Sequence, residues 1–165
     1  MRLSRIWALE FSFAISMLIS TACATVSYRV EAKDYDVMPI VAQISKKIMN
    51  SHHFTKRGIK IYISSDSYAN RYLAYTNGKN SVFLSPRLLL SYENQYLDVI
   101  IAHELGHIQY ETADQNLANL FAARVVSKSK VMEWLRYIKV NHLANSRDEE
   151  IDAMIEYLEN QLLLK

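Results

Sequence analysis

Two histidines four positions apart, His103 and His107, enclose a glutamate, Glu104, and these three residues have the types and spacing to do chemistry. On a helix the two imidazoles project from one face a turn apart and can bind a single ion. Zinc suits neutral imidazole, and a catalytic zinc site keeps one position open beside three protein ligands. A carboxylate next to that position can take a proton from water and pass it to a leaving amine. The pattern predicts a zinc metallopeptidase with one Zn²⁺, the ligands His103 and His107, and Glu104 as the catalytic residue.

The segment around this motif has the pattern of a helix. From Glu93 onward no proline occurs, and apolar residues recur at helical spacing. They are Leu97, Ile100, Ile101, Leu105 and Ile108. Gly106 lies inside this predicted helix, where a glycine costs about 1 kcal/mol relative to alanine. We therefore expect another part of the chain to approach the helix closely at Gly106.

The rest of the chain predicts an α+β fold, a mostly helical zincin-like domain with a small antiparallel sheet packed near the motif helix. Three glycines and two prolines in 165 residues favour long helices over many short strands. Apolar residues at helical or alternating spacing predict the other elements. They are helices over residues 35–51, 86–90, 117–126, 131–140 and 147–164, a strand over 59–63, and a hairpin of 74–76 and 81–85 around the Asn77-Gly78 turn.

The charges of the chain indicate no nucleic-acid partner. Lys and Arg number 19 against 17 Asp and Glu, which gives a net charge of +2, and the basic residues are scattered along the sequence. Such a balance is typical of a solvated, mixed surface.

A third zinc ligand has to come from outside the histidine pair. Glu111 would lie in a row with the histidines on a straight helix and could not wrap a tetrahedral ion. Asp114 and Gln115 are too close to His107 in the sequence for the chain to reverse and return. The acidic cluster Asp148-Glu149-Glu150 begins a new predicted helix and is far enough away to fold back. The spacing leaves these three carboxylates open as ligands.

Two segments of the chain carry the motifs of a known family. They are the segment from Tyr68 to Ile108, with Val82-Phe83-Leu84-Ser85 and Ile101-Ala102-His103-Glu104-Leu105-Gly106-His107, and the later Ser146-Arg147-Asp148-Glu149-Glu150-Ile151-Asp152-Ala153. In these HExxH and SRxxExxA motifs the chain resembles the gluzincin metallopeptidases that include HtpX-like heat-shock proteases, CAAX prenyl proteases and periplasmic BepA-like quality-control proteases. The resemblance implies that Glu150 is the third zinc ligand. It also implies a polypeptide substrate, an unfolded or misassembled cell-envelope protein, whose extended backbone pairs with the strand over residues 81–85.

One position departs from this family. Met154 stands where the family usually has an aspartate that orients a zinc-binding histidine, and loss of such a partner typically weakens metal affinity or activity about ten- to a hundredfold. Asp152 is a candidate substitute, and a register shifted to make it that aspartate turns Asp148 into the ligand. We favour Glu150 because Ser146, Arg147 and Ala153 then also stand at the family's motif positions. The departure leaves a second function open, a catalytically weak or inactive zinc-binding chaperone or assembly factor.

A second local similarity concerns the segment after the motif helix. Ala118-Asn119 with Phe121-Ala122-Ala123 is similar to the helix that follows HExxH in repressor-cleaving ImmA-type proteases, whose glutamate aligns with Gln115. We give this similarity less weight, because an amide is a poor zinc ligand and Gln115 is close to His107 in the sequence.

The N-terminus has the three-part layout of a secretory signal over residues 1–24. Arg2 and Arg5 precede an apolar run over residues 6–19, and small residues follow it. Cys23, the only cysteine, resembles the lipid-attachment cysteine of bacterial lipoproteins, whereas Ala22-Cys23-Ala24 also fits cleavage after Ala24. An uncleaved anchor is the third alternative, which Glu10 in the apolar run weakens. We expect a signal over 1–24, a tether over 25–34 and the peptidase domain over 35–165, in the bacterial periplasm and held at a membrane by a lipid or an N-terminal anchor.

Overall fold

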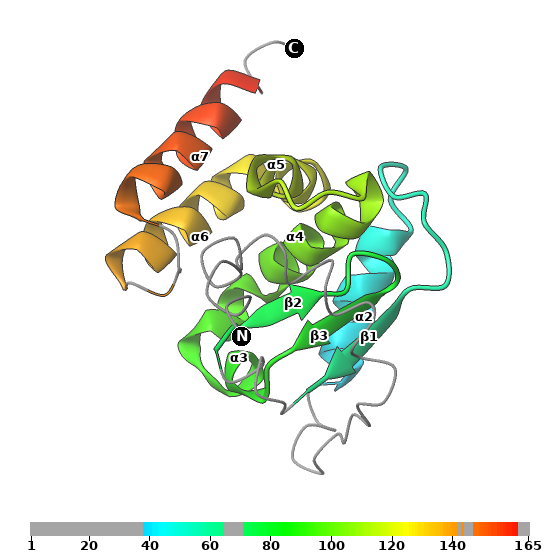
Figure 1. Cartoon of the computed structure of the whole chain (residues 1–165). Coiled ribbons are helices and arrows are strands. Elements are labelled where there is room, and N and C mark those ends of the chain that lie inside the picture. The colour runs from blue at the N-terminus through cyan, green and yellow to red at the C-terminus, as the bar shows by residue number, and fades with distance from the viewer. Residues whose placement is uncertain (1–37, 65–70, 142, 144–146, 162–165) are drawn as a thin grey trace, which may run out of the picture.

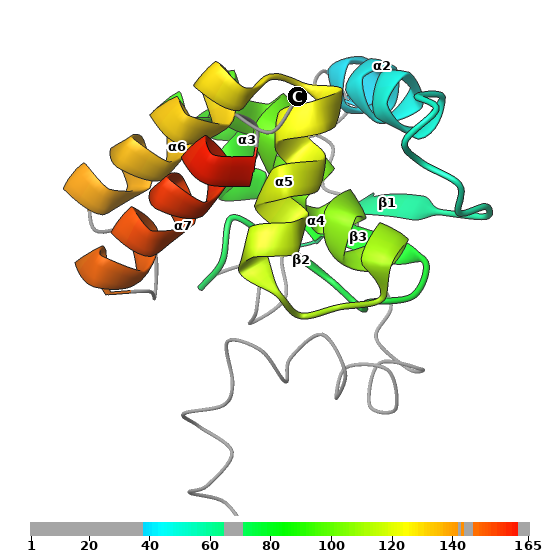
Figure 2. The ribbon, with the colours of Figure 1, turned by 90° about the horizontal axis from the view of Figure 1, so that it is seen from above.

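The computed structural model describes residues 38–64, 71–141, 143 and 147–161, which are arranged around helix α4 (Figure 1). The helices are α2 (Met38–Met49), α3 (Pro86–Leu90), α4 (Leu97–Tyr110), α5 (Gln115–Val125), α6 (Lys128–Val140) and α7 (Asp148–Gln161), a 3₁₀ turn η3 (Tyr92–Tyr96) leads into α4, and the strands are β1 (Lys60–Ile63), β2 (Ala74–Thr76) and β3 (Ser81–Leu84). The strands and α2 lie on one side of α4, and α5, α6 and α7 lie on the other (Figure 1, Figure 2). The predicted α+β, mostly helical fold is confirmed.

The sheet has the order β1-β3-β2, so β3 is its central strand. The predicted hairpin is present, because β2 pairs antiparallel with β3, and the Asn77 side chain closes its turn by accepting hydrogen bonds from the backbone N–H groups of residues 79, 80 and 81. The strand β1 runs parallel to β3, and the sheet is therefore mixed and not wholly antiparallel. Since both edges of β3 are already paired, the expectation that residues 81–85 pair with a substrate is wrong. The outer strand beside α4 is β2.

Helix α4 is buried on several sides because the sheet, α2 and α5 all contact it. The apolar stripe predicted from the sequence is buried along its whole length. The helix begins at Leu97, and residues 92–96 before it form the 3₁₀ turn. Such turns are common at the start of α-helices. The helix that carries the HExxH motif is thus fixed by packing over most of its surface.

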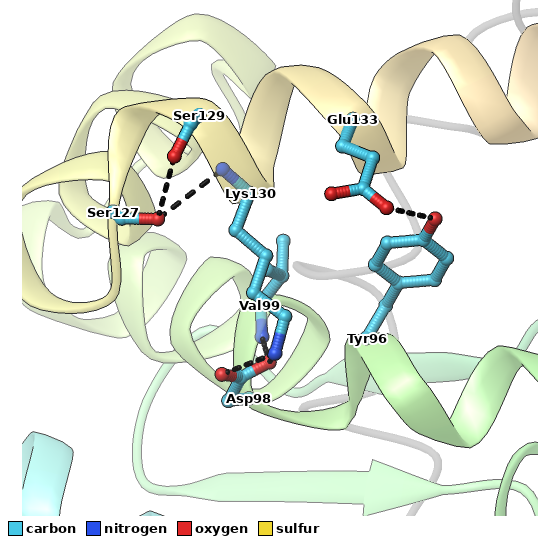
Figure 3. Close-up of polar contacts among 7 residues, drawn as sticks. All are labelled: Tyr96, Asp98, Val99, Ser127, Ser129, Lys130 and Glu133. Atoms are coloured by element: carbon cyan, nitrogen blue, oxygen red, sulfur yellow. Dashed lines mark hydrogen bonds and ion pairs between the residues drawn. The ribbon is translucent and has the colours of Figure 1, made fainter.

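Helix α6 holds the start of α4 through polar contacts (Figure 3). The ammonium of Lys130 lies 2.8 Å from the carboxylate of Asp98, and the Tyr96 hydroxyl donates a hydrogen bond to Glu133 at 3.1 Å. Burial and the Glu133 carboxylate raise the pKa of Tyr96 to about 12, so the hydroxyl keeps its proton and remains a donor. These contacts fix the end of α4 that precedes the motif.

The chain reverses sharply between α4 and α5. Glu111 ends α4 with a positive φ of 50°, and the backbone N–H of Thr112 donates to the carbonyl of His107 at 3.1 Å. Asp114 then caps α5, because its carboxylate accepts hydrogen bonds from two backbone N–H groups of the first turn. Helix α5 therefore runs back along α4 and makes the most extensive contact of any element with it.

Gly106 lies where α5 comes closest to α4. A Cβ atom at this position would lie 2.9 Å from the Cα of Ala118 and 3.0 Å from its carbonyl oxygen. The close approach expected at Gly106 is confirmed, and its partner is the backbone of α5.

Replacing Gly106 with alanine is expected to lower the free energy of unfolding by about 1–2 kcal/mol. Overpacking against backbone atoms costs about 1–3 kcal/mol, and alanine regains up to about 1 kcal/mol through its higher helix propensity. Unfolding in urea measures the difference. Ala153→Gly on the exposed face of α7 gives the propensity change alone. A Gly106→Ala protein as stable as the wild type would contradict the tight α4–α5 packing.

The predicted signal over residues 1–24, including Cys23, and the tether over 25–34 lie outside the described residues. Among the helices that the structure describes, none is long and apolar enough to cross a membrane. The division into signal, tether and domain remains a prediction.

Candidate metal centre

The two motif histidines meet on one face of α4. Their Nε2 atoms are 3.1 Å apart, and their rings are nearly perpendicular, with centroids 4.7 Å apart. The i, i+4 spacing thus places both imidazoles at one point, as the sequence predicts.

Hydrogen bonds at the other ring nitrogens fix the tautomers of both histidines. The Nδ1 of His107 lies 2.9 Å from the carbonyl oxygen of Thr112, and the Nδ1 of His103 lies 2.7 Å from the Oδ1 of Asn119. Because both oxygens can only accept, each Nδ1 carries the proton and each Nε2 carries a lone pair. Two lone pairs at 3.1 Å cannot hydrogen-bond to each other. A cation at this point would take both lone pairs, so the pair fits the zinc ion that the motif implies.

Burial keeps the imidazoles neutral. Burial and the neighbouring His107 lower the pKa of His103 to about 3, and burial lowers the pKa of His107 against the opposing effect of its bond to Thr112. At neutral pH both rings are therefore in the uncharged form that binds metal ions.

Glu104 is buried on α4 beside His103. Burial raises the pKa of its carboxyl group from 4.5 to about 8, so without a nearby cation the group is protonated at neutral pH. A positive charge close by favours the ionised carboxylate and opposes this effect. The carboxyl group can therefore exchange a proton near neutral pH, as a general acid and base must.

Helix α5 brings two further polar residues, Gln115 and Asn119, to the histidine pair. The Nε2 of Gln115 lies 3.4 Å from the Nε2 of His107, and Asn119 holds His103. The expectation that the chain cannot return so soon after His107 is wrong, because the left-handed Glu111 and the cap at Asp114 reverse it within a few residues. Three features of the sequence indicate that α5 returns to α4. They are the four-residue spacing of Gln115 and Asn119, the capping residue Asp114, and Gly106.

The acidic cluster at the start of α7 does not join the histidines. The carboxylate of Glu150 accepts hydrogen bonds from the backbone N–H and the guanidinium of Arg147, each at 3.2 Å, while Asp148 and Glu149 are exposed. Over the part of the chain that the structure describes, no three His, Cys, Asp or Glu side chains are grouped to hold a metal ion. The role of Glu150 as the third ligand remains a prediction.

The position of Met154 explains how the chain manages without the family's aspartate. The Met154 sulfur lies 3.6 Å from the Nδ2 of Asn119, whose oxygen accepts the proton of His103. The proposed substitute, Asp152, instead pairs with Lys139 at 2.7 Å. Orientation of His103 thus comes from an amide on α5, and the Met154 sulfur on α7 accepts a hydrogen bond from the Nδ2 of that amide.

The chain matches a known protein family. No curated protein and no solved structure matches the chain. A family model, that of peptidase family M48, matches residues 38–164 and so spans α2 to α7 with both motifs. This match extends over more than half of the 165 residues. The chain therefore belongs to peptidase family M48, the gluzincin metallopeptidases.

Proposed function

We propose that the protein is a zinc-dependent endopeptidase that hydrolyses peptide bonds of unfolded or misassembled cell-envelope proteins. The observation that carries this proposal is the pair of Nε2 atoms that converge at 3.1 Å on the same helix as the buried carboxyl group of Glu104, in a chain of a peptidase family. His103 and His107 would hold the ion. Zinc would supply a Lewis acid that polarises the peptide carbonyl.

Glu104 would carry the protons of the reaction. As a carboxylate it takes a proton from the attacking water, and as the acid it returns that proton to the leaving amine. Its buried position keeps bulk water from competing for this proton, and burial, which raises the pKa of the carboxyl group, opposes the effect of a bound cation, which lowers it. Both roles use one carboxyl group, and the motif supplies that group next to the ligands.

The substrate would bind along β2. This strand is one of the two outer members of the described sheet and has the more extensive contact with α4, so an extended chain added to it would run past the motif helix. Main-chain pairing of this kind gives affinity with little dependence on side chains. Unfolded proteins offer such extended segments, and the predicted signal over residues 1–24 supports a place in the bacterial periplasm, tethered to a membrane.

Removal of the metal is expected to stop cleavage. The protein is incubated with a denatured, unstructured protein, and the products are followed by mass spectrometry before and after treatment with a chelator. We expect cleavage that the chelator abolishes and that added zinc restores. In His103→Ala zinc should restore nothing, because one of the two ligands is lost. Cleavage that continues in the chelator would contradict the proposal, and a zinc-bound protein that cleaves no denatured substrate would favour a chaperone or assembly factor.

A further inference from the structure

We propose that Asn119 is the positioning residue of His103, and that its amide, held by Met154, keeps the imidazole proton away from the metal-binding nitrogen. The inference rests on the proposed function, because His103 would be one of the two histidines that hold the ion. It adds a residue on α5 to that site and leaves the predicted third ligand, Glu150, unchanged.

Asn119 is a buried polar residue with a partner at each end of its amide. It lies on α5 and is 2% exposed. Its Oδ1 lies 2.7 Å from the Nδ1 of His103 on α4, and its Nδ2 lies 3.6 Å from the sulfur of Met154 on α7. Burial of an amide is costly unless its ends are hydrogen-bonded. The three helices therefore satisfy this amide together.

The packing of α5 on α4 brings so short a side chain to the ring. Gly106 lies between the two histidines in the sequence, and the backbone of Ala118 fills the space where its Cβ would be. Asn119 follows Ala118 directly, so it lies where the two helices are closest. The hydrogen bond to His103 thus depends on a close approach that a larger residue at position 106 would prevent.

The bond to Asn119 decides which nitrogen of His103 faces the metal. A neutral imidazole has one protonated nitrogen and one lone pair, and the hydrogen bond made by one nitrogen sets the state of the other. Because Oδ1 can only accept, the proton is on Nδ1 and the Nε2 lone pair is free for an ion. Without this acceptor the proton can move to Nε2, which would donate it to the Nε2 of His107, 3.1 Å away. The histidines would then bond to each other where they should hold the ion.

Met154 keeps the amide of Asn119 from turning over. A thioether sulfur is a weak acceptor and cannot donate, so it pairs with the amide nitrogen and leaves the oxygen for His103. The reversed amide would point its N–H group at Nδ1 and favour the proton on Nε2. Asp152, on the same helix as Met154, pairs with Lys139 instead. A neutral amide, oriented by a sulfur atom, thus takes the role of a carboxylate.

Zinc affinity should follow the acceptor at position 119. Asn119→Ala should weaken zinc binding about ten- to a hundredfold, the usual result of losing such a partner. Asn119→Asp keeps an oxygen acceptor at the same place and should restore the affinity of the wild type or exceed it. Met154→Leu keeps most of the volume but has no acceptor. It should weaken zinc binding about two- to fivefold, the lower part of the range for a neutral hydrogen bond.

The zinc dissociation constants of the wild type and of each variant are measured by competition with a chromophoric chelator. Asn141→Ala is the matched control, because it removes an exposed amide at the end of α6 that donates to the carbonyl oxygen of Tyr137. This control should bind zinc as tightly as the wild type.

Nitrogen NMR of the imidazoles in the metal-free protein gives a readout independent of activity, since the shifts report which ring nitrogen carries the proton. The His103 signals are identified by their absence from His103→Ala. At neutral pH the His103 proton should be on Nδ1 in the wild type and in Asn119→Asp, and at least partly on Nε2 in Asn119→Ala. The wild-type tautomer alone tests the inference even if an Asn119 variant fails to fold.

The outcomes separate the two proposals. Zinc binding and a tautomer that are unchanged in Asn119→Ala would overturn the inference and leave the zinc peptidase intact. Weaker binding that Asn119→Asp does not restore would also overturn it, because the amide would then act only through packing. A Met154→Leu protein with the wild-type affinity would show that Met154 does not hold the amide. A wild type that binds no zinc would overturn the proposed function, and a His103 proton on Nε2 in that protein would overturn the inference as well.

Discussion

Glu104→Gln is expected to lower the rate of peptide cleavage by about 10²- to 10⁴-fold, the usual contribution of a general acid–base group. Glutamine has nearly the size of glutamate and fits the same buried place on α4, but it cannot take a proton from water. The two histidines and the amides of α5 are unchanged, so the affinity for zinc should remain close to that of the wild type. The variant therefore separates the chemistry of Glu104 from the binding of the metal.

The rate is measured with a denatured protein as substrate at equal amounts of bound zinc in the wild type and the variant. Glu156→Gln is the matched control, because it makes the same change at an exposed site on α7 and should leave the rate unaltered. Full activity of a zinc-bound Glu104→Gln protein would show that Glu104 takes no part in the reaction. If both proteins bind zinc and neither cleaves the substrate, the result favours a chaperone or assembly factor.

The motif helix and its histidines could be predicted from the sequence because both depend on local spacing. Apolar residues at helical intervals predict α4, and the i, i+4 pair on it predicts the meeting of His103 and His107. The hairpin of β2 and β3 follows in the same way from the Asn77-Gly78 turn. The Asn77 side chain accepts the hydrogen bonds that close this turn. In each case the residues that decide the structure lie within a few positions of one another.

The sheet order and the second side of the site could not be predicted, because they depend on contacts between distant segments. Alternation marks β1 as a strand, but nothing in its residues says that it pairs in parallel with β3. The return of α5 depends on one residue in the left-handed conformation, Glu111, and glutamate is not typical there. Local spacing therefore did not indicate that the tight turn brings Gln115 to the histidines, and the role of Glu150 stays a prediction.

The same Glu104→Gln change is expected to stabilise the metal-free protein by about 3 kcal/mol at pH 7. Burial raises the pKa of Glu104 from 4.5 to about 8, so the unfolded chain loses this proton near pH 4.5 and the folded chain keeps it until about pH 8. Between these values the unfolded chain binds fewer protons, and the free energy of unfolding falls as the pH rises. Glutamine does not titrate, so the free energy of unfolding of the variant does not fall for this reason. His103 and His107 are present in both proteins, so their effect on stability largely cancels in the difference.

Urea unfolding in the presence of a chelator, at pH 4.5 and at pH 7, gives the free energy of unfolding of both proteins. The variant should match the wild type at pH 4.5 and exceed it at pH 7. A difference between Glu104→Gln and wild type that is the same at both pH values would mean that the buried carboxyl group does not titrate as proposed. With zinc bound the gain should shrink, because the cation favours the ionised carboxylate and lowers the pKa of Glu104. The Glu104 carboxyl group, which the proposed reaction requires, would then destabilise the fold only while the metal is absent. Such a conflict between stability and activity is expected of a buried catalytic acid.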